Sequence, residues 1–238
     1  FSSADGTLRW SLYVGGEVQN RPTISPSGMI GFVSVGCFAP TSCYRYLKAF
    51  DVASGKILWS RPSDGPGHSG GGCSSPAVSP DGKTVFIGSL YPAGVYAFGA
   101  SAGNLLWAFP TSDQANVSPR LSADGSRLYF GSYSCNLYAV DTATGSQIWA
   151  SLVDECPPGD PHHGEIVCSE VAIQPSGDYL LLGALSGQLY AFNSTNGDND
   201  LIVGVTGGPI YSSPAISKDG LSAFVGSDDG RLYAFDVA

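Results

Sequence analysis

The residues best suited to metal chemistry gather in one segment of the chain, which reads DECPPGDPHHGE. His162 and His163 are adjacent in it, and Asp160 and Glu165 each lie two residues from the nearer histidine. Imidazole and carboxylate groups together bind divalent metal ions, so these four residues are candidate metal ligands. No defined motif requires a metal at this spacing, and a solvated polar loop is the alternative interpretation.

The third histidine, His68, lies in a glycine-rich segment that reads GPGHSGGG. This segment lacks the lysine and the strand-to-helix context of a phosphate-binding loop. The chain also contains no GxSxG motif, the signature of one large class of hydrolase nucleophile. The sequence therefore identifies no catalytic residue and favours neither nucleotide binding nor nucleophilic hydrolysis.

The chain has six cysteines, and none of them has the CxxC or Cys/His spacing of a structural zinc site. In an oxidising compartment they would form disulfides. Six cysteines allow about 15 connectivities. We predict the pairs Cys37–Cys43 and Cys156–Cys168, which join near neighbours, and by elimination the pair Cys73–Cys135.

Other features bear on location and partners. Glycosylation sequons begin at Asn116 and Asn193, and with the even cysteine count they favour an extracellular or extracytoplasmic location. The net charge of −9 argues against nucleic-acid binding, which depends on Lys and Arg side chains that neutralise phosphates. No apolar run approaches the roughly 20 residues of a membrane helix. Since the chain shows neither an initiator Met nor a signal peptide, we expect a processed chain or an excised domain.

A repeated unit must position these residues, and its clearest copy is AFDVASGKILW at Ala49–Trp59. The unit recurs at Ala97–Trp107 and Ala139–Trp149, in degraded form at Ala191–Leu201, and in part at both ends of the chain. Its second residue recurs at separations between 42 and 52 residues. A period of this size is typical of propellers and solenoids.

A second motif precedes the first in each repeat, as in SPAVSPDG at Ser75–Gly82. It predicts a short strand that enters a glycine turn, and the alternating apolar run after it predicts a second strand. The first unit supplies the third and fourth strands, with Asp51, Asp141 or Asn193 expected to accept backbone N–H bonds in the turn between them. The tryptophans share one repeat position, which predicts packing between neighbouring repeats: Trp10, Trp59, Trp107 and Trp149.

The two ends of the chain predict a closed ring. The C-terminal repeat supplies three strands, and Thr7–Trp10 would supply the fourth, which removes the exposed sheet edges. We therefore predict an all-β fold, a single five-bladed β-propeller of four-stranded antiparallel blades, with the last blade closed by the N-terminal strand. The predicted blades span residues 19–61, 72–109, 115–151, 167–203, and 211–238 together with 1–12. A slice of a larger propeller is the alternative.

The repeat SPAVSPDGKTVFIGS…VYAFGASAGNLLW resembles the pyrroloquinoline-quinone-like propeller repeat of the quinoprotein alcohol dehydrogenases, including its tryptophan-docking motif. The resemblance covers nearly the whole chain and implies propeller architecture. It transfers no catalytic site, because the chain has no adjacent cysteine pair and all its tryptophans occupy docking positions. The same repeat also builds non-catalytic scaffolds such as a bacterial outer-membrane assembly lipoprotein. We expect no cofactor and no pyrroloquinoline quinone, with a divalent metal left open.

One face of the predicted propeller carries the long, irregular connections. These are the links between blades and those between second and third strands, and they hold all the cysteines and histidines. Loops on a rigid scaffold commonly bind ligands, and tyrosines there can contact sugars or peptides. The candidate ligand-binding residues are Tyr44, Tyr46, Tyr91, Tyr133 and His68, with packing against the blade rim as the alternative role of the tyrosines.

We therefore predict a non-catalytic, secreted or extracytoplasmic recognition or scaffold propeller that binds a protein, peptide or glycan on this disulfide-pinned face. One alternative is a quinoprotein-like or metal-dependent oxidoreductase with a site at the channel mouth, lined by His68, His162, His163 and Asp160. A second alternative is a structural domain of a larger surface protein. We expect neither nucleic-acid binding nor membrane insertion.

Overall fold

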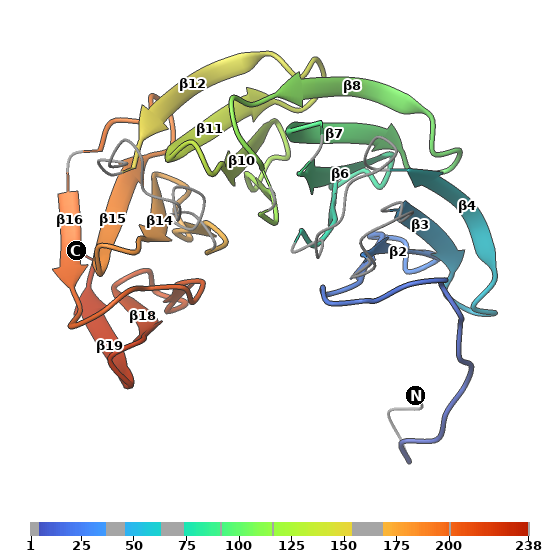
Figure 1. The fold of residues 1–238 in the computed structure, drawn as a ribbon, viewed down its shortest axis with the longest axis horizontal. Coiled ribbons are helices and arrows are strands. Elements are labelled where there is room, and N and C mark those ends of the chain that lie inside the picture. Colours follow the sequence, from blue (N-terminus) through green and yellow to red (C-terminus); the bar gives the residue numbers. More distant parts are fainter. Residues whose placement is uncertain are drawn as a thin grey trace.

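The structure is a computed structural model, and it describes residues 5–36, 46–62, 74–90, 92–115, 117–153, 169–199 and 201–237. The regular elements among these residues are β-strands, which form five antiparallel sheets. Figure 1 shows the sheets following one another in sequence order along an open arc. No helix in the described part of the chain is long and apolar enough to cross a membrane.

The strands of the five sheets are, in chain order, β1 (Thr23–Ile24), β2 (Ile30–Val35), β3 (Tyr46–Asp51) and β4 (Ile57–Pro62); β5 (Ala77–Val78), β6 (Thr84–Ser89), β7 (Gly94–Gly99) and β8 (Leu105–Pro110); β9 (Arg120–Leu121), β10 (Arg127–Gly131), β11 (Asn136–Asp141) and β12 (Gln147–Leu152); β13 (Ala172–Ile173), β14 (Tyr179–Gly183), β15 (Gln188–Asn193) and β16 (Leu201–Val205); β17 (Ala215–Ile216), β18 (Ser222–Ser227) and β19 (Arg231–Asp236).

Each sheet is a simple meander in which every strand pairs with the next. The outer rim of the arc is formed by β4, β8, β12 and β16 (Figure 1). The two-residue first strands stand at the opposite end of each sheet and therefore face the centre of the arc, which we call the channel. The predicted all-β fold of antiparallel sheets is confirmed.

The hydrophobic core lies between neighbouring sheets. Phe32 of β2 is fully buried and packs in one cluster with Val85 of the second sheet. The same register position is held in the next three sheets by Phe86, Tyr129 and Leu181. Each of these residues belongs to a buried cluster that its own sheet shares with the following sheet. Burying one such side chain contributes about 1.5–3 kcal/mol, so each sheet depends strongly on the sheet that follows it.

The tryptophans of the outer strands join neighbouring sheets, as predicted. The indole N–H of Trp59 donates to the carbonyl of Ala100 at 2.9 Å, and that of Trp149 donates to the carbonyl of Ser194 at 3.1 Å. The Trp59 ring lies against Gly103, whose φ is +67° and where an added Cβ would come within 2.7 Å of the indole. Glycine is required there both for the left-handed backbone and for the close approach of the ring.

Short turns join the third and fourth strands. Asp51 Oδ1 accepts the N–H of Ser54, and Asp141 Oδ1 accepts the N–H of Thr144, both at 2.8 Å. In the fourth sheet Asn193 Oδ1 accepts the N–H two residues later at 2.9 Å. These side chains satisfy backbone groups that the turn leaves unpaired, and their predicted role as turn residues is confirmed.

The last sheet has three strands, and the predicted closure by the N-terminal segment is not present. Residues 5–16 form no strand, and Thr7–Trp10 does not pair with β19. Trp10 docks on the first sheet in the way that Trp59 docks on the second: its indole N–H donates to the carbonyl of Val52 at 3.0 Å, and its ring meets Phe50 edge-on at 5.6 Å between centroids. Figure 1 places this segment across the opening of the arc from β19. Trp10 thus makes the predicted docking contact, whereas the strand that would complete the last sheet is not formed.

Candidate binding face and channel mouth

The connections divide between two faces. Links between sheets and links between second and third strands lie on one face, which we call the loop face; the remaining turns form the turn face. The link from Pro62 to Ala77 on the loop face is much longer than the turn from Asp51 to Ile57 on the turn face. The connections on the loop face are therefore longer and less uniform in length than those on the turn face.

Many of the residues predicted to bind ligands or metal lie outside the described residues, and their roles stay predictions. They are Tyr44, Tyr91, His68, His162, His163, Asp160 and Glu165, together with Cys37, Cys43, Cys73, Cys156, Cys168 and the sequon residue Asn116. The described part of the chain contains no group of three or more His, Cys, Asp or Glu side chains that could hold a metal ion.

The two described candidate tyrosines both lie on the loop face. Tyr46 begins β3, and the ammonium group of Lys48 lies 5.2 Å from the centre of its ring, a cation–π contact. Tyr133 lies in the turn between β10 and β11 and is half-buried. Its N–H donates to the carbonyl of Gln114 at 2.8 Å, which ties this turn to the link before β9. Both tyrosines are thus presented by an ordered backbone.

Cys135 and Asn193 are the remaining predicted site residues that the structure describes. Cys135 is fully buried and adopts a φ of 62°. Its carbonyl accepts the N–H of Val153 at 2.8 Å, which joins its turn to the link after β12. Because Cys73 lies outside the described residues, the pairing Cys73–Cys135 stays a prediction. The same holds for glycosylation of Asn193, whose side chain closes a turn.

The channel carries a charged cluster at its loop-face end that the sequence reasoning missed. One guanidinium nitrogen each of Arg21 and Arg120 lies 3.4 Å from Oε2 of Glu170. The three residues come from the first, third and fourth sheets. We call this cluster the channel mouth.

A signal for the channel mouth was present in the repeat. The residue that lies two positions before the start of the first strand is serine in three repeats: Ser75, Ser118 and Ser213. Arg21 and Glu170 replace that serine in the other two. Charged residues of opposite sign at a repeat position that is otherwise serine indicate a role that is specific to these two repeats, such as an ion pair or a binding site.

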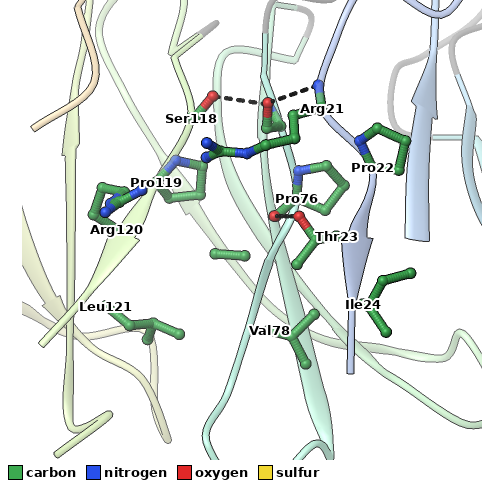
Figure 2. Close-up of a pocket in the computed structure, with 12 residues that line it drawn as sticks. Arg21, Pro22, Thr23, Ile24, Pro76, Val78, Ser118, Pro119, Arg120 and Leu121 are labelled. Atoms are coloured by element: carbon green, nitrogen blue, oxygen red, sulfur yellow. Dashed lines mark hydrogen bonds between the residues drawn. The ribbon is translucent and has the colours of Figure 1, made fainter. Parts of the chain in front are cut away.

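Beside the channel mouth lies a cavity of about 370 Å³, lined by the segments that lead into and form β1, β5 and β9 (Figure 2). The N–H of Arg21 donates to Ser75 Oγ at 3.3 Å, and the N–H of Ser75 donates to Ser118 Oγ at 2.9 Å. These bonds run from one sheet to the next and fix the spacing of the three segments. These segments of the sheet scaffold therefore form the described wall of the cavity.

Acids with shifted pKa values serve local structure. The hydroxyl of Ser122 and the backbone N–H of Ser126 lower the pKa of Asp124 to about 2 in a turn-face turn. On the loop face, the hydroxyl of Tyr233 is the main group that lowers the pKa of Asp229. Both carboxylates are ionised at neutral pH and accept several hydrogen bonds, those of Asp229 including the N–H of Gly207 from the link before β17, which does not suit them to act as general acids.

Known proteins similar to this chain share its architecture. The chain is 24% identical to the outer membrane protein assembly factor BamB of Yersinia pestis, over 97% of this chain and 64% of that protein. Its structure resembles the crystal structure of BamB from Moraxella catarrhalis, with a TM-score of 0.72, 17% identity, and coverage of 97% of this chain and 64% of that one. The β-propeller domain of Cps50 (Swd1) from Myceliophteria thermophila gives a TM-score of 0.68 at 14% identity, covering 95% of this chain and 67% of that domain.

The chain thus spans 64% of the length of the BamB proteins that it matches. The structural similarities, at these identities, establish the β-propeller fold. The profile of the family described as outer membrane protein assembly factor BamB matches residues 44–238, which is most of the chain. The chain belongs to this BamB family of pyrroloquinoline-quinone-like propeller repeats.

Proposed function

We propose that this chain is a non-catalytic propeller scaffold that binds a protein partner through its loop face in an extracytoplasmic compartment. Membership of the BamB family supports a scaffold, because the family and a curated relative are named as outer membrane protein assembly factor BamB. A propeller suits this role since rigid sheets can present connections of any length without changing their own packing.

The observation that carries the proposal is the contrast between the two faces. On the turn face, short turns use their own polar groups, as Asp51 and Asp124 do with neighbouring N–H and hydroxyl groups. On the loop face, the sequence provides long links between strands, and Arg21 of the channel mouth is mostly exposed. The loop face therefore offers both the variable surface and the accessible charge that recognition of a partner requires.

Two finer features belong to the proposal. Three disulfides, with Cys73–Cys135 among them, would hold the loop face in its binding shape and so reduce the entropy lost on binding. The complete burial of Cys135 and its place on the loop face are compatible with this arrangement. The ligand is a protein or peptide rather than a glycan, which agrees with the assembly role that the relatives' names describe.

Site-specific photo-crosslinking tests the proposal in cells that make the protein. A photoreactive phenylalanine analogue replaces Tyr133 on the loop face and, as the matched control, Tyr179, which begins β14 on the turn face and is 41% exposed. We expect a discrete protein adduct from position 133 and none from position 179.

Equal adducts from both positions, or no protein adduct from the loop face, would overturn protein binding by this face. Stoichiometric metal or quinone in the natively isolated protein would overturn the non-catalytic part of the proposal. Native mass spectrometry of the same preparation measures this directly.

A further inference from the structure

The cavity at the channel mouth is amphipathic. Arg21 and Arg120 lie at its loop-face end, and Ile24, Val78 and Leu121 lie further along the same segments (Figure 2). Ile24 is 45% exposed although it belongs to a strand that faces the channel. A ligand that fills this cavity must therefore offer a polar group toward the arginines and apolar atoms next to it.

The charges of the channel mouth do not balance. Two guanidinium groups share a single carboxylate, and both contact the same atom, Oε2 of Glu170. Their distances of 3.4 Å exceed the roughly 2.7–2.9 Å of a strong charge-assisted hydrogen bond. The side chains of Arg21 and Arg120 are 66% and 42% exposed, whereas that of Glu170 is 23% exposed. The cluster thus presents a net positive charge on a chain whose net charge is −9.

We propose that this cavity binds a carboxylate side chain, together with an adjacent apolar side chain, from an acidic segment of the protein partner. The inference rests on the proposed function and names the chemistry of the partner. An incoming carboxylate would take a bidentate hydrogen bond from Arg21 or Arg120, a geometry that guanidinium groups favour. Glu170 competes for the same donors and sets how tightly the ligand is held.

An extended peptide fits this cavity better than a small anion does. The strands β1, β5 and β9 each pair on one side only, so their other edges face the channel. A peptide can use such edges and place alternate side chains toward the wall. The bonds from Arg21 to Ser75 and from Ser75 to Ser118 hold the three strands in place before a ligand arrives. This pre-organisation lowers the cost of binding.

The repeat itself supplies the variants that test the inference. Arg21→Ser and Glu170→Ser introduce the residue that three other repeats carry at this position, and Arg120→Ala introduces the residue of Ala77, Ala172 and Ala215. Each variant therefore places at one sheet a side chain that the other sheets already accommodate. Arg231→Gln is the matched control, because Arg231 also lies on the loop face and also contacts a carboxylate, Asp229, at 3.4 Å.

The probe is an acetylated and amidated peptide of alternating Leu and Glu, titrated by calorimetry beside the same peptide with Gln for Glu. We expect Arg21→Ser and Arg120→Ala each to weaken binding of the Glu peptide roughly tenfold, the effect of losing one charge-assisted hydrogen bond. Glu170→Ser is expected to tighten binding, because it removes the competing carboxylate, and Arg231→Gln to leave it unchanged. Thermal unfolding of each variant confirms that it is folded.

Equal affinity for the Glu and Gln peptides, or unchanged affinity in Arg21→Ser and Arg120→Ala, would overturn the inference. Weaker binding in folded Glu170→Ser would also overturn it, since Glu170 would then belong to the site rather than compete with the ligand. If inorganic phosphate binds as tightly as the Glu peptide, the cavity is a small-anion site and the peptide assignment falls. A protein adduct from position 133 combined with no peptide binding would overturn this inference alone and leave the proposed function standing.

Discussion

The faces between sheets and the free face of the last sheet carry the same kinds of residue in opposite surroundings. One such position lies on the second strand, opposite the first residue of the first strand. The side chains there are at most 2% exposed in the first four sheets (Phe32, Phe86, Tyr129 and Leu181), whereas Phe224 of β18 is 40% exposed. A second such position is the second residue of the third strand. The side chain there is fully buried in the first four sheets (Leu47, Val95, Leu137 and Leu189), whereas Leu232 of β19 is 77% exposed. The register between the second and third strands is the same in all five sheets.

The comparison shows that each sheet forms its strand pairs from its own sequence, whereas its stability depends on burial against neighbouring sheets. β17–β19 keeps its pairing without a neighbour on one face, so strand pairing does not require one. Burial of apolar area, however, comes from the neighbour on each face, as in other repeat proteins: Ala223 and Val225 of the last sheet are buried against the fourth sheet. The first sheet shows the complementary case: Val33 and Phe50 are buried beneath Trp10, Leu12 and Val14 of the N-terminal segment, which covers that end of the arc.

Introducing a charge should give the largest difference in stability between a buried face and the free face of the last sheet. Leu189→Arg puts an unpaired charge into a dry interface and is expected to lower the free energy of unfolding by more than about 4 kcal/mol. Leu232→Arg changes an exposed side chain and is expected to cost less than about 0.5 kcal/mol. Urea unfolding followed by tryptophan fluorescence measures both. A large loss in Leu232→Arg would mean that the free face is covered in solution, and the comparison would fail.

Truncation of an aromatic side chain should give the next largest difference. Phe86→Ala opens a cavity between the second and third sheets and is expected to cost about 3–5 kcal/mol. Phe224→Ala removes a side chain that is only partly buried and should cost about 1 kcal/mol. The two variants are compared by their denaturation midpoints at the same pH and salt concentration. Similar losses would contradict the dependence of each sheet on its following neighbour.

The sheets could be predicted from the sequence because their signals are local. Alternation marks the second strands, and the shared place of Trp59 and Trp149 marks the contact between sheets. Closure could not be predicted in this way, since it depends on small rotations summed over all sheets. Trp10 docks on the first sheet through the same contact as Trp59 and Trp149 make, so its docking gives no evidence of closure.

The candidate site shows the same limit. Arg21 and Glu170 stand out as departures from a repeated serine, which a comparison of the repeats can find. That Arg21 of the first sheet meets Glu170 of the fourth depends on the curvature of the arc, which brings residues 149 positions apart together. Sequence therefore locates the unusual residues, and the structure shows which of them meet.

The loss of a single docking hydrogen bond should have a smaller effect. Trp149→Phe keeps a ring in the docking position but removes the bond from the indole N–H to Ser194, which should cost about 1–2 kcal/mol. Leu201 occupies the same repeat position in the fourth sheet, is 50% exposed, and has no docking turn in the last sheet. Leu201→Phe should therefore leave stability unchanged within about 0.5 kcal/mol. A stabilising Leu201→Phe would show instead that a docking surface is available at the last sheet.

The smallest expected effect concerns the turn face, where the last sheet should behave like the internal ones. Asp124 and Asp219 each accept a serine hydroxyl and a backbone N–H, at 2.6 and 3.1 Å in the third sheet and at 2.5 and 3.1 Å in the last. These bonds, with the serine hydroxyl first, lower both pKa values from their ordinary 3.8, that of Asp124 to about 2. A lowered folded-state pKa stabilises the protein above about pH 4, and this contribution is lost as the pH falls toward about 2.

Asp124→Ser and Asp219→Ser test this equivalence, because Ser27 and Ser176 already occupy the same position in two other sheets. Each variant should flatten the acid-side loss of stability between about pH 4 and pH 2 by a similar small amount, since both carboxylates are exposed and screened by solvent. Thermal unfolding at a series of pH values measures the slope. If only Asp124→Ser changed the slope, the turn of the last sheet would depend on the missing neighbour as well. Equal slopes would confine that dependence to the apolar faces, where Leu189 and Leu232 differ.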